Sequence, residues 1–223
     1  MDDPRRKWDT VYAAPGHVFG TEPNDFLAQV AHRISPGRVL CLADGEGRNG
    51  VHLAALGYEV VSVDVSPVGL SKARRLADAG RVPLAAVAAD VDHVCIERGG
   101  WSGVVSIFAH LPAELRARIH RRAVRGLAPG GAFVLEAYTP RQLGADGGPK
   151  DAGRMMDEPT LRRELSGLRF DVLRELRREL REGPRHNGPG EVVQLLAFKP
   201  DAPSAREGRG GRTDDPEGGT CTE

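Results

Sequence analysis

The sequence has few cysteines and no surplus of either charge. Its three cysteines, Cys41, Cys95 and Cys221, are widely spaced. This spacing excludes a disulfide framework and a CxxC metal site, so we expect free thiols and no bound metal. The 31 basic residues balance 31 acidic ones, which removes the usual argument for a partner that is a nucleic acid or an anionic membrane. We therefore expect neither partner.

Long apolar runs are also absent. No run approaches the roughly 20 residues of a membrane span. The first ten residues, MDDPRRKWDT, contain no apolar stretch typical of a secretory leader, so we expect a cytoplasmic protein. Residues 201–223 contain no Leu, Ile, Val, Met or aromatic residue. Such a segment can bury little apolar surface, and we predict that it is a disordered tail.

The rest of the chain alternates β-prone runs with helical patterns. Apolar, β-branched runs predict strands at residues 38–43, 59–64, 82–89, 103–109 and 131–137. Periodic patterns between them predict helices at residues 48–56, 67–79 and 112–127. Before the first strand, Asn24 is placed to cap a helix that runs toward Ile34, and a short helix near Arg5 would carry Trp8 and Tyr12. Strands that alternate with helices predict a parallel α/β sheet.

The C-terminal part breaks this alternation. Residues 169–180 and 191–200 are both β-capable, and the connection between them, REGPRHNGPG, is rich in Gly and Pro. We predict an antiparallel hairpin there, although the LRRELREG sequence would also permit a helix over residues 169–180. The predicted fold class is α/β, with a Rossmann-like, doubly wound, mostly parallel seven-stranded sheet that ends in this hairpin. The arginine-rich residues 162–181 alternate with glutamates and predict a solvated, charge-balanced face.

Three features at the strand ends indicate a binding crevice. The first strand runs into the glycine turn DGEGRNG at residues 44–50, where Gly45 and Gly47 allow a sharp turn. Asp64 ends the second strand and is placed to bind a ribose diol, while Asp90 follows the third strand, where an adenine edge could be recognised. Each feature alone is weak, because short glycine turns and strand-end carboxylates are common. Together they predict one crevice at the carboxyl edge of the sheet.

The sequence VLCLADGEGRNGVHLAALGYEVVSVDVSPVGLSKARRLA, at residues 39–77, resembles the cofactor half of class I S-adenosylmethionine-dependent methyltransferases. Residues 8–27, 107–112, 127–138 and 183–200 resemble further parts of a small bacterial branch similar to tellurite-resistance and thiol methyltransferases. The resemblance implies S-adenosylmethionine as cofactor and in-line methyl transfer to a small-molecule acceptor, such as a thiol or a metalloid oxyanion. It also implies a helical cap at residues 1–36, a methyltransferase domain at residues 37–200, and a monomer or weak homodimer.

The resemblance assigns the cofactor to residues of the predicted crevice. Many enzymes of the class carry an acidic residue within the first strand, where this sequence has Cys41 and Ala43. We therefore expect Asp44, or its backbone, to contact the amino group of the cofactor. Arg48 could pair with the cofactor carboxylate, with Asp44 or with Glu46. The complete set of expected cofactor residues is Asp44, Gly45, Glu46, Gly47, Arg48, Asn49, Asp64, Val65, Ser66, Asp90, Val91 and Ala109.

The acceptor side has less readable chemistry. The resemblance implies catalytic roles for His110 and Tyr138. His110 follows the fourth strand and is the best candidate for a base, although a packed histidine without proton transfer fits equally. Tyr138 could equally be a packing residue, and Glu136 could serve only as a hydrogen-bond partner. A base is needed only for a weakly acidic acceptor, since a thiol or an oxyanion is already nucleophilic. Substrate-side positions are Trp8, Tyr12, Phe19, His186 and the loop at residues 144–149, with His186 expected in an exposed turn.

Two other functions fit parts of the sequence. Cys41 and Ala43 are also compatible with a cofactor-binding regulatory or scaffold protein that has lost catalysis. Gly45, Gly47 and Gly50 satisfy the GxGxxG pattern of a nicotinamide-dependent oxidoreductase. The sequence shows neither the Tyr-Lys pair nor the second domain expected of such an oxidoreductase, which makes it the weaker alternative.

Overall fold

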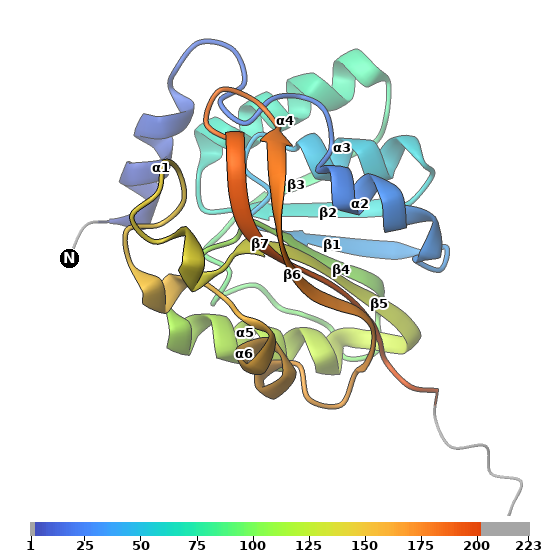
Figure 1. The fold of residues 1–223 in the computed structure, drawn as a ribbon. Coiled ribbons are helices and arrows are strands. Elements are labelled where there is room, and N and C mark those ends of the chain that lie inside the picture. The colour runs from blue at the N-terminus through green and yellow to red at the C-terminus, as the bar shows by residue number, and fades with distance from the viewer. Residues whose placement is uncertain (1–2, 202–223) are drawn as a thin grey trace, which may run out of the picture.

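The computed structural model describes residues 3–201 and places them around one seven-stranded sheet (Figure 1). The strand order is β3-β2-β1-β4-β5-β7-β6. Strands β1 to β5 are parallel, and β7 runs antiparallel between β5 and β6. This arrangement confirms the predicted fold class. The strands are β1 Arg38–Leu42, β2 Glu59–Asp64, β3 Ala85–Ala88, β4 Trp101–Ile107, β5 Leu127–Tyr138, β6 Arg169–Arg181 and β7 Asn187–Phe198.

Helices cover both faces of the sheet, and α1 lies beside its carboxyl edge (Figure 1). Helices α2, α3 and α4 lie on one face, and α5 and α6 lie on the other. The predicted tail, residues 201–223, lies outside the described residues apart from Asp201. The helices are α1 Pro4–Tyr12, α2 Asp25–Val30, α3 Arg48–Ala55, α4 Pro67–Gly80, α5 Ala113–Gly126 and α6 Glu158–Glu164, with 3₁₀ turns η1 Ala31–Arg33, η2 Pro140–Gln142 and η3 Ala152–Arg154.

The central strand β1 is buried on both faces, which is why its sequence is a continuous apolar run. Val39 and Cys41 belong to the core beneath α2 and α3. Leu40 and Leu42 belong to the core formed with α5 and α6. Because alternate side chains of β1 enter the two cores, the register of the strand is fixed. The turn that follows β1 therefore begins at a defined position on the sheet edge.

Side-chain caps define several helix starts. Asn24 accepts a hydrogen bond from the Leu27 amide at 3.0 Å, as predicted. Asp157 caps α6 through the Thr160 amide at 2.9 Å. Helix α6 was not predicted, because a seven-residue helix is too short to show a clear helical period.

The C-terminal hairpin is confirmed, and the alternative of a helix over residues 169–180 is wrong. Twelve residues of β6 pair with β7, so the ladder outweighs the helix propensity of the Arg, Glu and Leu residues. Strand β5 begins at Leu127, four residues before the predicted start. Strand β3 is shorter than predicted, because only residues 85–88 pair with β2.

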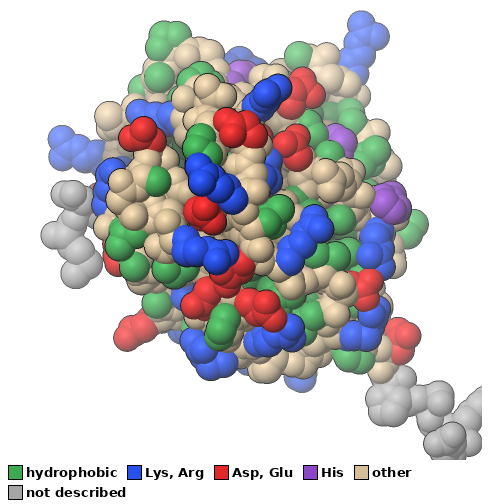
Figure 2. Space-filling view, in the orientation of Figure 1, with side chains coloured by type: hydrophobic (Ala, Val, Ile, Leu, Met, Phe, Trp, Pro, Cys, Tyr) green, Lys and Arg blue, Asp and Glu red, His purple; other side chains and the backbone are tan. Residues whose placement is uncertain are grey.

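The face shown in Figure 2 carries Lys and Arg side chains interspersed with Asp and Glu, without a patch of a single sign. No helix in residues 3–201 has the length and the apolar character that crossing a membrane requires.

Candidate active site

A cavity of about 720 Å³ lies at the carboxyl edge of the parallel strands. It lies beside β1 and β4, the neighbouring strands whose following connections go to opposite sides of the sheet. Open α/β sheets bind ligands at this position. Nine of the twelve expected cofactor residues line the cavity, and three do not. The lining residues are Asp44, Glu46, Arg48, Asn49, Asp64, Val65, Asp90, Val91 and Ala109; the other three are Gly45, Gly47 and Ser66.

The two central strands each end in a strained residue. Ala43 follows β1 and Phe108 follows β4, and both have a φ of 51°. This left-handed conformation costs a non-glycine residue roughly 1–2 kcal/mol. Both residues line the cavity. Backbone strain clusters at active sites and ligand-binding edges, and both strained residues lie at this edge.

The two turn glycines serve close packing. A Cβ at Gly45 would lie 2.4 Å from the hydroxyl of Tyr12, and a Cβ at Gly47 would lie 2.4 Å from the Cβ of Ala73 in α4. Gly45 and Gly47 also have positive φ angles of 58° and 84°, which favour glycine. These glycines therefore let α1 and α4 approach the turn. Ser66 caps α4 through the Gly69 amide at 3.1 Å.

Two carboxylates, the buried Asp64 and the half-buried Asp44, lie at one end of the cavity. Asp64 accepts hydrogen bonds from the amides of Gly45 at 2.9 Å and Ser66 at 2.8 Å. Burial raises the pKa of Asp64 to about 6 despite these bonds. Asp44 accepts hydrogen bonds from the Ser62 hydroxyl at 2.6 Å and the Gly50 amide at 3.2 Å. Burial raises the pKa of Asp44 to about 7. A ligand that offers positive charge or hydrogen-bond donors suits this end.

The cavity residues Glu46 and Asn49 hold the N-terminal segment in place. Glu46 accepts hydrogen bonds from the Val18 amide at 2.7 Å and the Phe19 amide at 3.3 Å. Its other oxygen pairs with Lys72 at 2.8 Å. Asn49 accepts a hydrogen bond from the Asn24 amide at 2.9 Å. Both carboxylate oxygens of Glu46 and the Oδ1 of Asn49 are therefore already engaged with the chain itself.

Arg48 pairs with neither Asp44 nor Glu46, the two protein partners expected for it. Its guanidinium lies 2.6 Å from the carboxylate of Glu182, a residue at the end of β6. Both side chains are almost fully buried. The expectation of a partner within the glycine turn was wrong because Glu182 is 134 residues away in the sequence, and only the folded hairpin brings it there. The contact with the cofactor carboxylate stays a prediction.

A buried charge network continues from this pair. Arg178 pairs with Glu182 and, at 2.5 Å, with Glu136. Glu136 accepts a further hydrogen bond from Gln194 at 2.7 Å. Arg178 is therefore not part of a solvated face, as the charge pattern of residues 162–181 had predicted. In the buried part of the network two guanidiniums balance two carboxylates, and the exposed Asp25 also pairs with Arg178 at 3.0 Å.

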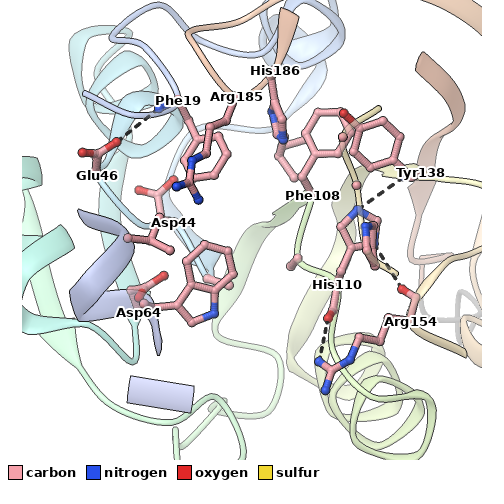
Figure 3. Close-up of a pocket in the computed structure, with 18 of the residues that line it drawn as sticks. Phe19, Asp44, Glu46, Asp64, Phe108, His110, Tyr138, Arg154, Arg185 and His186 are labelled. Atoms are coloured by element: carbon pink, nitrogen blue, oxygen red, sulfur yellow. Dashed lines mark hydrogen bonds between the residues drawn. The ribbon is translucent and has the colours of Figure 1, made fainter. Parts of the chain in front are cut away.

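Aromatic and imidazole rings line the opposite side of the cavity (Figure 3). The His186 ring lies 4.3 Å from Phe108 and 4.8 Å from Phe19, measured between ring centroids. His186 is only 9% exposed, so the expectation of an exposed turn was wrong. The turn is drawn inward because Gly183 packs directly on Gly20 and Phe19. The Nδ1 atom of His186 is buried and has no hydrogen-bond partner among the described residues.

His110 and Tyr138, which lie on the same side of the cavity, are uncharged at physiological pH. His110 Nδ1 lies 3.1 Å from the Arg154 carbonyl, and its Nε2 accepts a long hydrogen bond of 3.5 Å from the Tyr138 amide. Burial lowers the pKa of His110 to about 4. Burial also raises the pKa of Tyr138 to about 12. The Tyr138 ring stacks on His110 with centroids 5.5 Å apart. This geometry favours the packed, positioning role for His110 over that of a base.

The N-terminal helix closes the remaining side. Trp8 and Tyr12 of α1 line the cavity and stack with centroids 5.4 Å apart. The cavity-lining residues Phe108 and Arg185 were not among the expected site residues. Phe108 could have been found, because it directly follows β4 just as Asp64 ends β2. Arg185 could not, since its position depends on how the hairpin turn packs.

Residues 39–131 match the family model of a methyltransferase domain. These residues therefore form a methyltransferase domain. A search of curated proteins gives no match to the sequence. Solved structures with this fold include an enzyme studied for the conversion of a disulfide bond into a thioacetal group during echinomycin biosynthesis, at 18% identity and a TM-score of 0.73. The similarity covers 91% of this chain and 94% of that one.

Two further structures show how widely the methyltransferase fold is used. TehB from Haemophilus influenzae is 19% identical, with a TM-score of 0.65 over 87% of this chain and 66% of that one. The [4+2]-cyclase SpnF is 18% identical, with a TM-score of 0.63 over 87% of this chain and 91% of that one. A shared fold therefore does not by itself fix the reaction.

The hydrogen-bond acceptors that line the cavity fit S-adenosylmethionine, the cofactor of this domain. The molecule offers hydrogen-bond donors along its length, namely an ammonium, a ribose diol and an adenine amine. Asp44, Asp64 and Asp90 present acceptor oxygens along the edge. A nicotinamide dinucleotide fits poorly, because its diphosphate would lie at the glycine turn and face Asp44. The Gly50 amide of the helix start, which could bind a phosphate, is already taken by Asp44.

Proposed function

We propose that this protein methylates a small-molecule nucleophile, either a thiol or a metalloid oxyanion. The observation that carries the proposal is the chemistry of the ring-lined side of the cavity. Both ring nitrogens of His110 face backbone groups, and the Tyr138 hydroxyl stays protonated because its pKa is raised by burial. Neither residue can act as an efficient base. An acceptor that is already nucleophilic suits such a site. A thiol with a pKa of about 8.5 is such an acceptor, because a fraction of it is thiolate at neutral pH.

The reaction is an in-line displacement. When bound, the cofactor supplies a methyl group on a positively charged sulfur. The acceptor atom forms a bond to the methyl carbon, and the electron pair of the broken carbon–sulfur bond stays on the departing sulfur. The chain holds the two reactants in line and excludes water, effects that supply up to about 7–11 kcal/mol in favourable cases. The aromatic faces of Phe19, Phe108 and Tyr138 favour a nearby positive charge.

We assign the cofactor contacts by chemistry and position. Asp64, at the end of β2, accepts hydrogen bonds from the ribose hydroxyls, and Asp90, after β3, accepts a hydrogen bond from the adenine amine. Asp44 accepts a hydrogen bond from the ammonium group. The free Nδ1 of His186 is a hydrogen-bond site for the acceptor, and the loop that includes Gly147 and Gly148 closes the acceptor side. The sulfur chemistry described for the echinomycin enzyme supports a sulfur acceptor.

Ligand titration tests the proposed function. Isothermal calorimetry compares S-adenosylhomocysteine with NAD. We expect S-adenosylhomocysteine to bind and NAD to bind at least a hundredfold more weakly. Tight NAD binding without S-adenosylhomocysteine binding would contradict the proposal. Binding of S-adenosylhomocysteine without turnover on any thiol, metalloid oxyanion or small oxygen nucleophile would instead support the regulatory or scaffold alternative.

A further inference from the structure

Arg185 is a cation of the cavity that has no partner of its own. It lies in the turn between β6 and β7 and points into the cavity, toward the end where Asp44 lies (Figure 3). The neighbouring cation Arg48 is neutralised by Glu182. Arg154 donates a hydrogen bond to the His110 carbonyl at 3.2 Å. Within residues 3–201 the Arg185 guanidinium forms no ion pair, so its charge is available to a ligand.

The backbone at Arg185 is fixed although its side chain is free. Its amide donates a hydrogen bond to the Val18 carbonyl at 3.3 Å. The turn is closed by the Glu182 amide, which donates to the His186 carbonyl at 2.8 Å. A Cβ at Gly183 would lie 2.2 Å from the Gly20 amide nitrogen, so the turn packs against the N-terminal segment backbone to backbone. This anchoring fixes where the side chain begins above the cavity, so only the side chain itself has to be ordered on binding.

The surroundings of Arg185 specify a zwitterion. Asp44 and Asp64 make the nearby end of the cavity negative, and that end suits an ammonium group. A guanidinium beside two carboxylates suits a ligand that carries both signs on adjacent atoms, which is the arrangement in an α-amino acid. Guanidinium groups bind carboxylates through two parallel hydrogen bonds.

We propose that Arg185 binds the α-carboxylate at the amino-acid end of the cofactor, while Asp44 binds the ammonium beside it. This inference rests on the proposed function. The sequence suggested Arg48 for the carboxylate, but Glu182 already occupies that side chain. An anionic methyl acceptor is the alternative ligand for the Arg185 guanidinium, and the experiment distinguishes this acceptor from the cofactor carboxylate.

The test compares two nucleosides by calorimetry. S-adenosylhomocysteine carries the amino acid, and 5′-methylthioadenosine shares its nucleoside and sulfur but lacks it. In Arg185→Met, which removes the charge and keeps most of the length, we expect the Kd of S-adenosylhomocysteine to rise at least tenfold and that of 5′-methylthioadenosine to change less than twofold. Arg181→Met, an exposed site on the same hairpin and outside the cavity, should leave both unchanged.

Three results would overturn the inference. The first is an unchanged affinity for S-adenosylhomocysteine in a folded Arg185→Met protein. The second is an equal loss for both nucleosides, which would mean that Arg185 shapes the cavity. The third is a raised KM for an anionic acceptor with unchanged nucleoside binding, which assigns Arg185 to the acceptor. If the wild-type protein binds neither nucleoside, the proposed function fails as well, and this outcome is distinct from the other three.

Discussion

The carboxylate of Asp64 accepts a hydrogen bond from the Gly45 amide at 2.9 Å, and this contact joins the end of β2 to the turn after β1. Its second oxygen accepts a hydrogen bond from the Ser66 amide at 2.8 Å. The same side chain therefore shapes the turn and presents its remaining lone pairs to the cavity. Predictions about the cofactor site follow from this double role.

Replacement of Asp64 by alanine should weaken S-adenosylhomocysteine binding more than tenfold, or about 1.4 kcal/mol, because charge-assisted bonds to the ribose are lost. Calorimetry measures the effect. Asp92→Ala, which removes a carboxylate outside the cavity, is the control. A loss of the turn alone would weaken adenosine and 2′,3′-dideoxyadenosine equally. The ribose assignment requires that the variant lose the wild-type preference for adenosine, and unchanged affinity would refute it.

Cofactor affinity should rise with pH across neutrality. Burial raises the pKa of Asp44 to about 7, so the carboxylate is protonated below that pH and ionised above it. An ammonium binds the ionised form, and S-adenosylhomocysteine binding should weaken up to about tenfold per pH unit below 7. Protonation of Asp64, whose pKa is about 6, should weaken the binding of both nucleosides. Protonation of Asp44 should weaken only the binding of S-adenosylhomocysteine, which carries the amino group. Equal pH profiles for S-adenosylhomocysteine and 5′-methylthioadenosine would rule out the Asp44 contact.

Ala43→Gly should stabilise the fold. The left-handed conformation at Ala43, with a φ of 51°, costs alanine roughly 1–2 kcal/mol and costs glycine almost nothing. Allowing for the greater entropy of glycine in the unfolded chain, we expect the free energy of unfolding to rise by about 0.5–1 kcal/mol. Urea denaturation measures it. The matched change Ala79→Gly, on the exposed face of α4, should lower stability by a similar amount. If both variants lose stability, the strain at Ala43 is not real.

Glu182→Gln should be the most destabilising of the changes considered. It would leave Arg48 and Arg178 without their shared counter-charge in a buried site, and removal of one partner from such a pair costs about 3–5 kcal/mol. Denaturant unfolding measures the loss. Glu179→Gln, an exposed position on the same strand, should change stability by less than about 0.5 kcal/mol. Similar stabilities for the two variants would show that the network contributes nothing to the fold.

The sequence predicts the sheet and its functional edge for a simple reason. Strands buried on both faces, such as the one containing Leu40 and Cys41, are continuous apolar runs, and loops after parallel strands must meet at one edge. Asp44, Asp64 and Asp90 could therefore be placed together before the structure was known. The prediction needs only local patterns and one topological rule.

The remaining features depend on contacts between distant segments. Arg48 meets Glu182 only because the hairpin folds back over the cavity, and no spacing in the sequence indicates this pair. His186 is buried because Gly183 packs on Gly20, which a Gly/Pro-rich turn does not reveal. The free guanidinium of Arg185 becomes recognisable only after Arg48 and Arg154 have been matched with their partners.

The central claim is methyl transfer to a nucleophile that needs no strong base. The most direct measurement uses S-adenosylmethionine with an isotopically labelled methyl group, and mass spectrometry follows the label in thiols, metalloid oxyanions and alcohols. We predict that a thiol or a metalloid oxyanion acquires the label, with one S-adenosylhomocysteine formed for each methyl transferred, and that alcohols do not. Transfer to alcohols alone, or no transfer to any acceptor by a protein that binds S-adenosylhomocysteine, would contradict this account.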